Sequence, residues 1–70
     1  MNLNLDRDAA RRARLLAGLT QSALAARVGV HPITVTRWES GAIRPRPDMI
    51  RRLAAALGLT VADIATVNNQ

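Results

Sequence analysis

The sequence predicts an all-α fold, a compact bundle of five helices. Seventy residues form one domain, and a chain of this size buries only about 60% of its extended surface. No segment shows the alternation of polar and apolar residues that is expected of a strand. Four glycines each stand where a helix is expected to end, at the position beyond a helix where glycine takes the left-handed conformation without a steric penalty. They are Gly18, Gly29, Gly41 and Gly58, and they imply four helices with chain left for a fifth.

The first two helices are expected near residues 6–17 and 20–28. Asp6 and Asp8 place negative charge at the start of the first helix, where the helix dipole favours it. Thr20 belongs to a residue type that accepts a hydrogen bond from a free backbone N–H at a helix start. The second helix therefore has a defined beginning at this residue.

The remaining helices are expected near residues 31–40, 47–57 and 60–66. Pro32 and Pro47 suit the first position of a helix, because the N–H that proline lacks has no partner there. The last helix opens with a capping-box pattern, in which a hydroxyl residue is followed three positions later by an acidic one. That pattern runs from Thr60 to Asp63.

We expect one domain over residues 1–70, with its core at about residues 6–66. Residues 1–4 and 68–70 are expected to be loose, as chain ends commonly are. Trp38 is the only aromatic residue, so the core is expected to consist mainly of Leu, Ile, Val and Ala.

The composition excludes several classes of protein. Without cysteine there are no disulfides, zinc–thiolate sites or thiol nucleophiles. No supported Ser–His–Asp set, carboxylate pair or glycine-rich phosphate loop is present, so we expect no enzyme activity, no metal and no cofactor. The apolar runs are too short to span a bilayer, and the first fourteen residues carry charges where a signal peptide needs an apolar stretch. We therefore expect a cytoplasmic protein with no membrane partner.

The charge balance indicates a polyanionic partner. All ten basic residues are arginine, and the net charge is +5. DNA is the commonest partner of so basic a small domain. A genome rich in Arg codons would explain the missing lysine but not the net charge. A basic amphipathic membrane peptide is a further alternative, which the regular spacing of the helix-ending glycines disfavours.

The second and third predicted helices are joined by a very short turn, residues 28–31. Two short helices with a glycine in a tight turn form a helix-turn-helix unit. Ala25 is small at the point where the helices cross, and Val30 fills the corner beside the turn. The shared apolar seam is expected to consist of Leu24, Val28, Val35 and Trp38.

Four stretches carry a resemblance to a known family: LTQSALA (19–25), VGV (28–30), TVTRWESG (34–41) and LAAALGLT (53–60). Together they closely resemble the Xre family of phage repressor and Cro-like DNA-binding domains, over roughly residues 10–65. The resemblance implies a lambda-repressor-like fold whose third helix lies in the major groove. It also implies a bacterial or phage-encoded protein that is associated with the nucleoid.

The resemblance further implies roles for single residues. Gln21 corresponds to a family glutamine that binds a phosphate and braces the recognition helix. Thr20 and Ser40 fall where family members contact phosphates. Arg14 and Glu39 resemble a family ion pair that ties the first helix to the end of the third.

The chain departs from the family pattern at two helix starts. Ala23 stands where the family usually has Glu, so the capping box of the second helix is incomplete. His31 replaces the usual Ser or Thr cap of the third helix, and Pro32 follows it. We interpret His31 as a weak cap close to a DNA phosphate, because one histidine without cysteines cannot build a zinc site.

The exposed face of the third helix can be inferred from its periodicity. At about 100° per residue, Val35, Trp38 and Glu39 share one side, and Ile33 and Arg37 lie opposite. An apolar Ile beside an Arg suits a DNA groove, where Ile packs on a thymine methyl and Arg pairs with guanine O6 and N7. The alternative is an ordinary surface helix with a stray Ile. The expected base contacts are Pro32, Ile33, Thr34, Thr36 and Arg37.

The longest internal loop, residues 42–46, carries Arg44 and Arg46 beside two prolines. Arginines in a stiff loop next to the recognition helix suit phosphate contacts that flank the groove. A solvated loop is the alternative. Arg51 and Arg52 are interpreted as the wet face of their helix.

A single recognition helix buries only about 600–1,000 Å² on DNA, so we expect a homodimer on a pseudo-palindromic operator of double-stranded DNA. Apolar residues near the C-terminus could supply the twofold contact. The expected interface is Val61, Ile64, Ala65 and Val67, with Leu15 as a second candidate. The alternative is that these residues complete the monomer core.

These observations favour a transcriptional regulator, most simply a repressor. The alternative from another class is an antitoxin-type module, whose main partner is a toxin protein and which also represses its own operon. Such antitoxins often carry an additional toxin-binding segment, and none is recognised after residue 67. Controllers of restriction–modification systems and phage regulators are possible subtypes. We expect no small-molecule ligand, because no effector domain is present.

Overall fold

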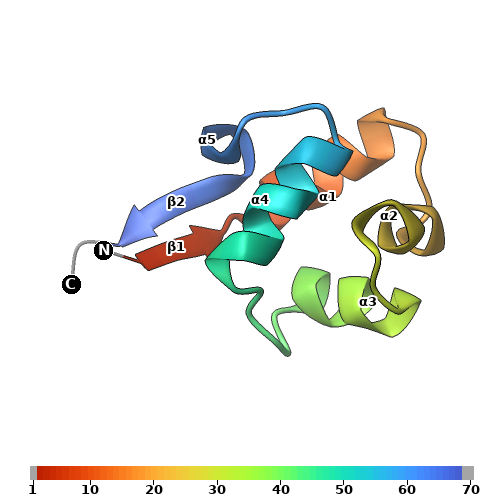
Figure 1. The fold of residues 1–70 in the computed structure, drawn as a ribbon, viewed down its shortest axis with the longest axis horizontal. Coiled ribbons are helices and arrows are strands. Elements are labelled where there is room, and N and C mark those ends of the chain that lie inside the picture. Colours follow the sequence, from red (N-terminus) through yellow and green to blue (C-terminus); the bar gives the residue numbers. More distant parts are fainter. Residues whose placement is uncertain (1, 69–70) are drawn as a thin grey trace.

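The computed structural model describes residues 2–68, with five helices and two short strands in these residues (Figure 1). All five helices lie between the two strands along the chain. The first and last elements, β1 and β2, pair with each other. In chain order the elements are β1 (Asn2–Leu5), α1 (Arg7–Leu16), α2 (Gln21–Val28), α3 (Pro32–Ser40), α4 (Pro47–Ala56), α5 (Val61–Ile64) and β2 (Ala65–Asn68).

The five helices confirm the fold expected from the sequence, and local signals explain most of their starts. The Asp6 carboxylate caps α1 by accepting a hydrogen bond from Ala9 N at 3.1 Å. Pro32 and Pro47 are the first residues of α3 and α4. At the start of α5, Asp63 Oδ2 accepts hydrogen bonds of 2.9 Å from both the backbone N and the hydroxyl of Thr60. These hydrogen bonds hold the pKa of Asp63 below its ordinary value.

The expectation that no strand would form is wrong. β1 and β2 pair as an antiparallel two-stranded sheet, in a register that joins Asn2 to Asn68 and Leu5 to Ala65. Residues 2–4 and residue 68 are therefore part of this sheet and not loose tails; Met1 and residues 69–70 lie outside the described residues. The sheet also shortens α5, which ends at Ile64 because Ala65 is already extended.

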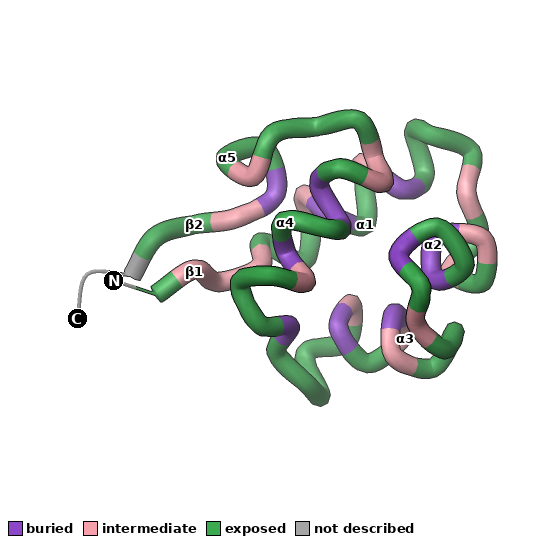
Figure 2. The backbone as a smooth tube through the Cα atoms, in the orientation of Figure 1, coloured by how far each residue is buried: buried purple, intermediate pink, exposed green. Residues whose placement is uncertain are grey.

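The apolar sides of the helices meet in one core (Figure 2). Leu3 and Leu5 of β1 pack against this core, and their contacts fix the short sheet to the helices. Trp38 is buried in the core, as its sequence position predicted. The buried apolar residues are Ala10, Leu24, Ala25, Val28, Val35, Trp38, Ile50, Leu53, Ala54 and Ile64.

Candidate nucleic-acid interface

The turn between α2 and α3 closes as the helix-turn-helix pattern predicted. Gly29 has a φ of +88°, the left-handed conformation that glycine adopts without strain. The backbone N–H groups of Gly29 and Val30 both donate to Ala25 O, at 2.8 and 3.0 Å. Ala25 itself is fully buried. These contacts set the angle at which α3 leaves α2.

α3 has one buried side and one exposed side. Val35 and Trp38 are buried against the rest of the molecule, whereas Arg37 is exposed and Ile33 is 44% exposed. An isoleucine left open to water beside an arginine is the arrangement that the periodicity of α3 indicated. Pro32 is exposed and Thr34 is half-buried on the flank of this surface.

The entry to α3 is capped by a histidine ring. His31 Nδ1 accepts a hydrogen bond of 3.2 Å from Ile33 N. The ring therefore takes the place of the Ser or Thr hydroxyl that more often caps a helix. His31 is exposed beside the start of α3.

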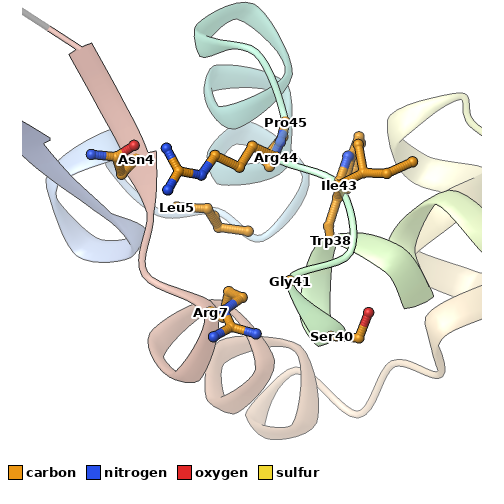
Figure 3. A pocket seen from close by; sticks show the side chains of 9 residues that line it. All are labelled: Asn4, Leu5, Arg7, Trp38, Ser40, Gly41, Ile43, Arg44 and Pro45. Carbon is orange, nitrogen blue, oxygen red and sulfur yellow. The ribbon is translucent and has the colours of Figure 1, made fainter.

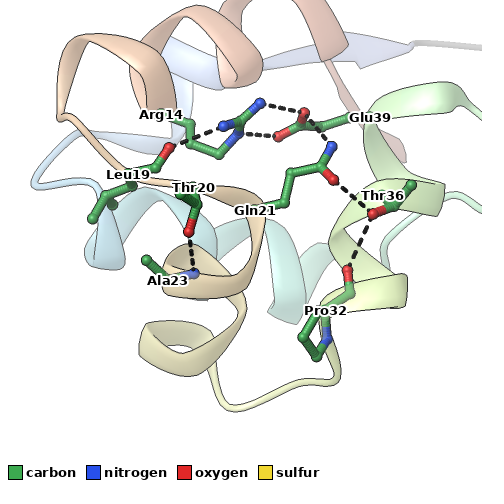
Figure 4. A network of polar contacts seen from close by, with 8 residues as sticks. All are labelled: Arg14, Leu19, Thr20, Gln21, Ala23, Pro32, Thr36 and Glu39. Carbon is green, nitrogen blue, oxygen red and sulfur yellow. Dashed lines mark hydrogen bonds and ion pairs between the residues drawn. The ribbon is translucent and has the colours of Figure 1, made fainter.

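Arg14 and Glu39 form an ion pair between α1 and α3 (Figure 4). Arg14 Nε donates to Glu39 Oε2 at 2.7 Å, and Arg14 Nη2 donates to Glu39 Oε1 at 3.0 Å. Both side chains are only 8% exposed. The remaining guanidinium nitrogen, Nη1, donates to Leu19 O at 2.9 Å. The pair thus joins α1, the loop before α2 and the end of α3.

Gln21 extends this network to the middle of α3. Its Nε2 donates to Glu39 Oε1 at 3.1 Å, and its Oε1 accepts from the Thr36 hydroxyl at 2.7 Å. Thr36 Oγ1 also lies 3.3 Å from Pro32 O. Thr36, expected as a base contact, therefore turns its hydroxyl toward Gln21, as Figure 4 shows. Thr20 caps α2 through its Oγ1, which accepts from Ala23 N at 3.0 Å.

The network controls the charge of Glu39. Burial raises the pKa of this carboxyl group. The hydrogen bonds from Arg14 and Gln21, with the charges of Arg14 and Arg11, lower the pKa by more, and it lies below its ordinary value of 4.5. Glu39 is consequently ionised at neutral pH, as its partner Arg14 requires.

The loop after α3 is held to the end of the helix. Ser40 Oγ donates to Arg37 O at 3.2 Å, and Ile43 N donates to the same carbonyl oxygen at 3.3 Å. Arg44 and Arg46 are exposed in this loop, as their sequence position suggested. Ser40 is the last residue of α3, and Arg44 and Arg46 lie in the loop that directly follows it.

One arginine gains a significance that the sequence did not reveal. Arg7, the first residue of α1, lies against Gly41, the residue that caps the end of α3 (Figure 3). A Cβ atom at Gly41 would approach Arg7 Cζ to 2.8 Å. The two residues are far apart in sequence, and no pattern in the chain indicated that they would meet.

The expected dimer surface needs a correction. Ile64 is fully buried in the monomer core, at 0% exposure, and so cannot form the centre of an interface. Val61 and Ala65 are half-buried and pack against the same core. Val67 remains open at 54% exposure. The other large exposed apolar residues include Leu15 and Leu16, at the end of α1.

In the described part of the chain, no helix has the length and apolar character that crossing a membrane requires. The same residues contain no cluster of three or more His, Cys, Asp or Glu side chains that could hold a metal ion.

Comparison with known proteins identifies the fold family. The helix-turn-helix family model matches residues 11–64. No curated protein sequence matches the chain. The solved DNA-binding domain of the P22 c2 repressor is 27% identical, with a TM-score of 0.78, and the alignment covers 89% of this chain and 82% of that one. The clp gene regulator ClgR from C. glutamicum is 30% identical, with a TM-score of 0.76 and coverage of 81% and 74%.

An enzyme also contains a similar region. Hydroxypropylphosphonic acid epoxidase from S. wedmorenis is 25% identical with a TM-score of 0.72, over 81% of this chain but only 30% of the epoxidase. The similarity is thus confined to a part of that enzyme. The family match over residues 11–64, which is most of the chain, shows that the chain belongs to the helix-turn-helix family.

Proposed function

We propose that this protein is a transcriptional repressor that binds a pseudo-palindromic operator in double-stranded DNA as a homodimer, with α3 in the major groove. One observation carries the proposal. α3 buries Val35 and Trp38 and exposes Ile33 and Arg37, while polar contacts along its length hold it to α1 and α2. A helix held this firmly presents its exposed side chains in a fixed orientation, which base recognition requires.

The exposed side chains of α3 are suited to reading base edges. The Arg37 guanidinium can donate two hydrogen bonds to guanine O6 and N7, and Ile33 can pack on a thymine methyl group. Pro32 and Thr34 flank them at the start of the helix. The hydroxyl of Thr36 is engaged by Gln21, so its methyl group is the part that would reach a base.

Phosphate contacts are proposed on both sides of this helix, because they fix the register of a protein on DNA. At the starts of α2 and α3, the candidates are Thr20, Gln21 and His31. At the end of α3 and in the loop that follows it, they are Ser40, Arg44 and Arg46. Arg44 and Arg46 are exposed in a loop, residues 42–46, that contains no acidic residue, and this supports the role.

Repression and dimer formation rest on different support. The P22 c2 protein, 27% identical to this chain, is a repressor by name. A dimer would double the contact area of a small recognition surface and match one turn of DNA with two half-sites, about 34–36 Å apart. Val67, exposed on β2, is the centre of the surface that we propose for the twofold contact, with the half-buried Ala65 and Val61 as further members.

Selection of bound sequences from random duplex DNA tests the proposal most directly. The purified protein should enrich one pseudo-palindromic motif, and footprinting should show protection of two half-sites. A matching reporter should be less active when the protein is present. Binding that enriches no sequence at all would contradict base recognition by α3.

The antitoxin-type alternative makes a different prediction. Such a module would bind a toxin protein. The observation that favours it is the apolar pair at the end of α1, Leu15 and Leu16, which are exposed at 57% and 78% and could contact a protein partner. Co-expression with the product of an adjacent gene, with Leu16→Asp as the variant, would separate the two functions. A repressor without a toxin partner should form no stable complex with that product.

A further inference from the structure

A cleft of about 330 Å³ lies where β1 and the start of α1 meet the end of α3 and the loop that follows it (Figure 3). Its apolar walls include Leu5, Trp38 and Ile43, while Arg7 and Arg44 line it from two different segments. The residues that line it include no carboxylate. Two guanidinium groups without an acidic partner in the lining give the cleft a positive potential that favours an anion.

The position of Arg7 depends on the absence of a side chain at Gly41. The guanidinium occupies the space that a Cβ atom would take, with Cζ 2.8 Å from that position. It therefore lies against the C-terminal end of α3, whose partial negative charge favours a cation. Among the residues that the structure describes, no carboxylate pairs with Arg7, so this packing holds it at the cleft with its charge available.

The cleft adjoins the exposed side of α3. Ser40 lines the cleft, and at 100° per residue it lies on the same side of the helix as Ile33 and Arg37. A duplex whose major groove receives α3 would therefore pass its sugar–phosphate backbone beside Ser40. The guanidinium groups of Arg7 and Arg44 would face that backbone from the two sides of the cleft.

We propose that this cleft binds one sugar–phosphate unit of the operator backbone, with Arg7 and Arg44 donating to the same phosphate. Arg7 thereby becomes a DNA ligand contributed by the start of α1. The Asn4 amide is within the same lining and adds a polar group from β1, while Leu5 and Ile43 offer apolar surface to the deoxyribose. The proposal rests on the proposed function, because it requires α3 to lie in the groove.

The test pairs protein variants with DNA in which single phosphates are neutralised. Duplexes of the selected operator carry a methylphosphonate at one backbone position each. Wild-type protein, Arg7→Ala and Arg44→Ala are titrated with every duplex at several salt concentrations. Arg52→Ala is the matched control, because it removes the same charge from an exposed arginine that lines a different cleft, beside α2 and α4. Thermal melts verify that each variant folds.

One methylphosphonate position should weaken the wild-type protein about tenfold and weaken Arg7→Ala and Arg44→Ala each by less, since each variant has already lost one of the two contacts to that phosphate. The salt dependence of both cleft variants should be shallower by about one unit of log K against log salt, and that of Arg52→Ala unchanged. Gly41→Ala should reproduce the effect of Arg7→Ala by displacing its guanidinium. Gly18→Ala is its control, because Gly18 also has a positive φ, +73°, but open space around it.

Three results would overturn the proposal. Arg7→Ala could keep the full wild-type response to every methylphosphonate while Arg44→Ala loses its response, which would leave Arg44 as the only ligand. Inorganic phosphate could bind the cleft of the free protein with no position-dependent effect in DNA, which would identify a site for small anions. Finally, wild-type protein that binds no duplex would overturn the proposed function together with this inference.

Discussion

Arg14 and Glu39, 25 residues apart in sequence, are joined by two hydrogen bonds that fix the end of α3 to α1. Because the pair is almost completely shielded from water, each charge is compensated in the folded protein only while its partner is present. Gln21 hydrogen-bonds to the same carboxylate and to the Thr36 hydroxyl. The ion pair is thereby linked through Gln21 to the centre of α3. The orientation of α3, the helix that we propose reads DNA, therefore depends on a charged pair behind it.

Replacing Glu39 by Ala should strongly destabilise the fold. The variant leaves the Arg14 guanidinium buried without its partner, and breaking one half of a buried ion pair costs about 3–5 kcal/mol. A small domain has roughly 5–15 kcal/mol of stability in total, so the melting temperature should fall far below that of the wild type. Asp48→Ala, at an exposed carboxylate, is the control and should change stability by less than about 1 kcal/mol. Equal melting temperatures for the two variants would contradict the structural role of Glu39.

Stability should also fall with acid in a way that depends on Glu39. Its pKa in the folded protein lies below the ordinary value of 4.5, so its contribution is fully present above that value. The contribution is then lost as the pH drops through the lowered pKa, when the carboxylate in the folded state takes up a proton. The difference in unfolding free energy between wild type and Glu39→Gln should be constant from pH 7 to about pH 5.5 and should shrink in more acidic solution. A difference that is independent of pH down to 2 would be inconsistent with an ionised Glu39.

Arg37 and Arg46 should have different effects on DNA binding. Arg37→Ala should cost about 1–3 kcal/mol on the preferred operator and relax the preference at one base pair. Arg46→Ala should weaken binding to all duplexes alike and make the salt dependence shallower by about one. Titrations of operator and scrambled duplexes at several salt concentrations separate these effects. An equal loss for Arg37→Ala on both duplexes would show that Arg37 does not read a base.

The proposed dimer can be tested at Val67 without disturbing the core. Val67→Asp puts a charge on an exposed position of β2, so the variant should keep its helical content while it dissociates into monomers and loses operator affinity. Analytical ultracentrifugation together with circular dichroism gives both readouts. Ile64→Ala is the contrasting variant: its side chain is buried, and its truncation should lower stability by about 2–5 kcal/mol.

A Val67→Asp protein that remains dimeric would direct attention to the end of α1. Leu15→Asp would then be the next variant, because Leu15 is exposed on a different element. A wild-type protein that is monomeric at high concentration and protects a single half-site would contradict the homodimer altogether.

The helices were predictable because each has a local signal that tertiary contacts did not override. Thr20 and Pro32 mark helix starts through the chemistry of their own side chains, and Gly29 marks an end through its backbone freedom. The exposed side of α3 followed from its period alone, since burial of Val35 and Trp38 leaves Ile33 on the opposite side.

What the sequence did not reveal depends on contacts between distant segments. Asn2 to Leu5 do alternate polar and apolar residues, contrary to the expectation that no segment would, but the pattern is only four residues long. A strand this short is stable only when it finds β2 and the core. Ile64 lies in an apolar C-terminal segment, and no local pattern separates a residue that completes the core from one that faces a second copy. The position of Arg7 could likewise not be predicted from the sequence, because it depends on contact with Gly41 at the end of another helix.

The antiparallel pairing of β1 with β2 places Asn2 opposite Asn68, so the two ends of the domain are neighbours in space. A short linker between them would close the backbone into a ring. That ring could be reopened at the turn that contains Gly58, where the surroundings are open: a Cβ atom placed on Gly58 would meet no atom within 4 Å. In this circular permutant the two strands become a local hairpin. The entropy of closing the longest loop in the chain then no longer opposes sheet formation. The permuted order should fold faster than the natural one, because its contacts are closer in sequence.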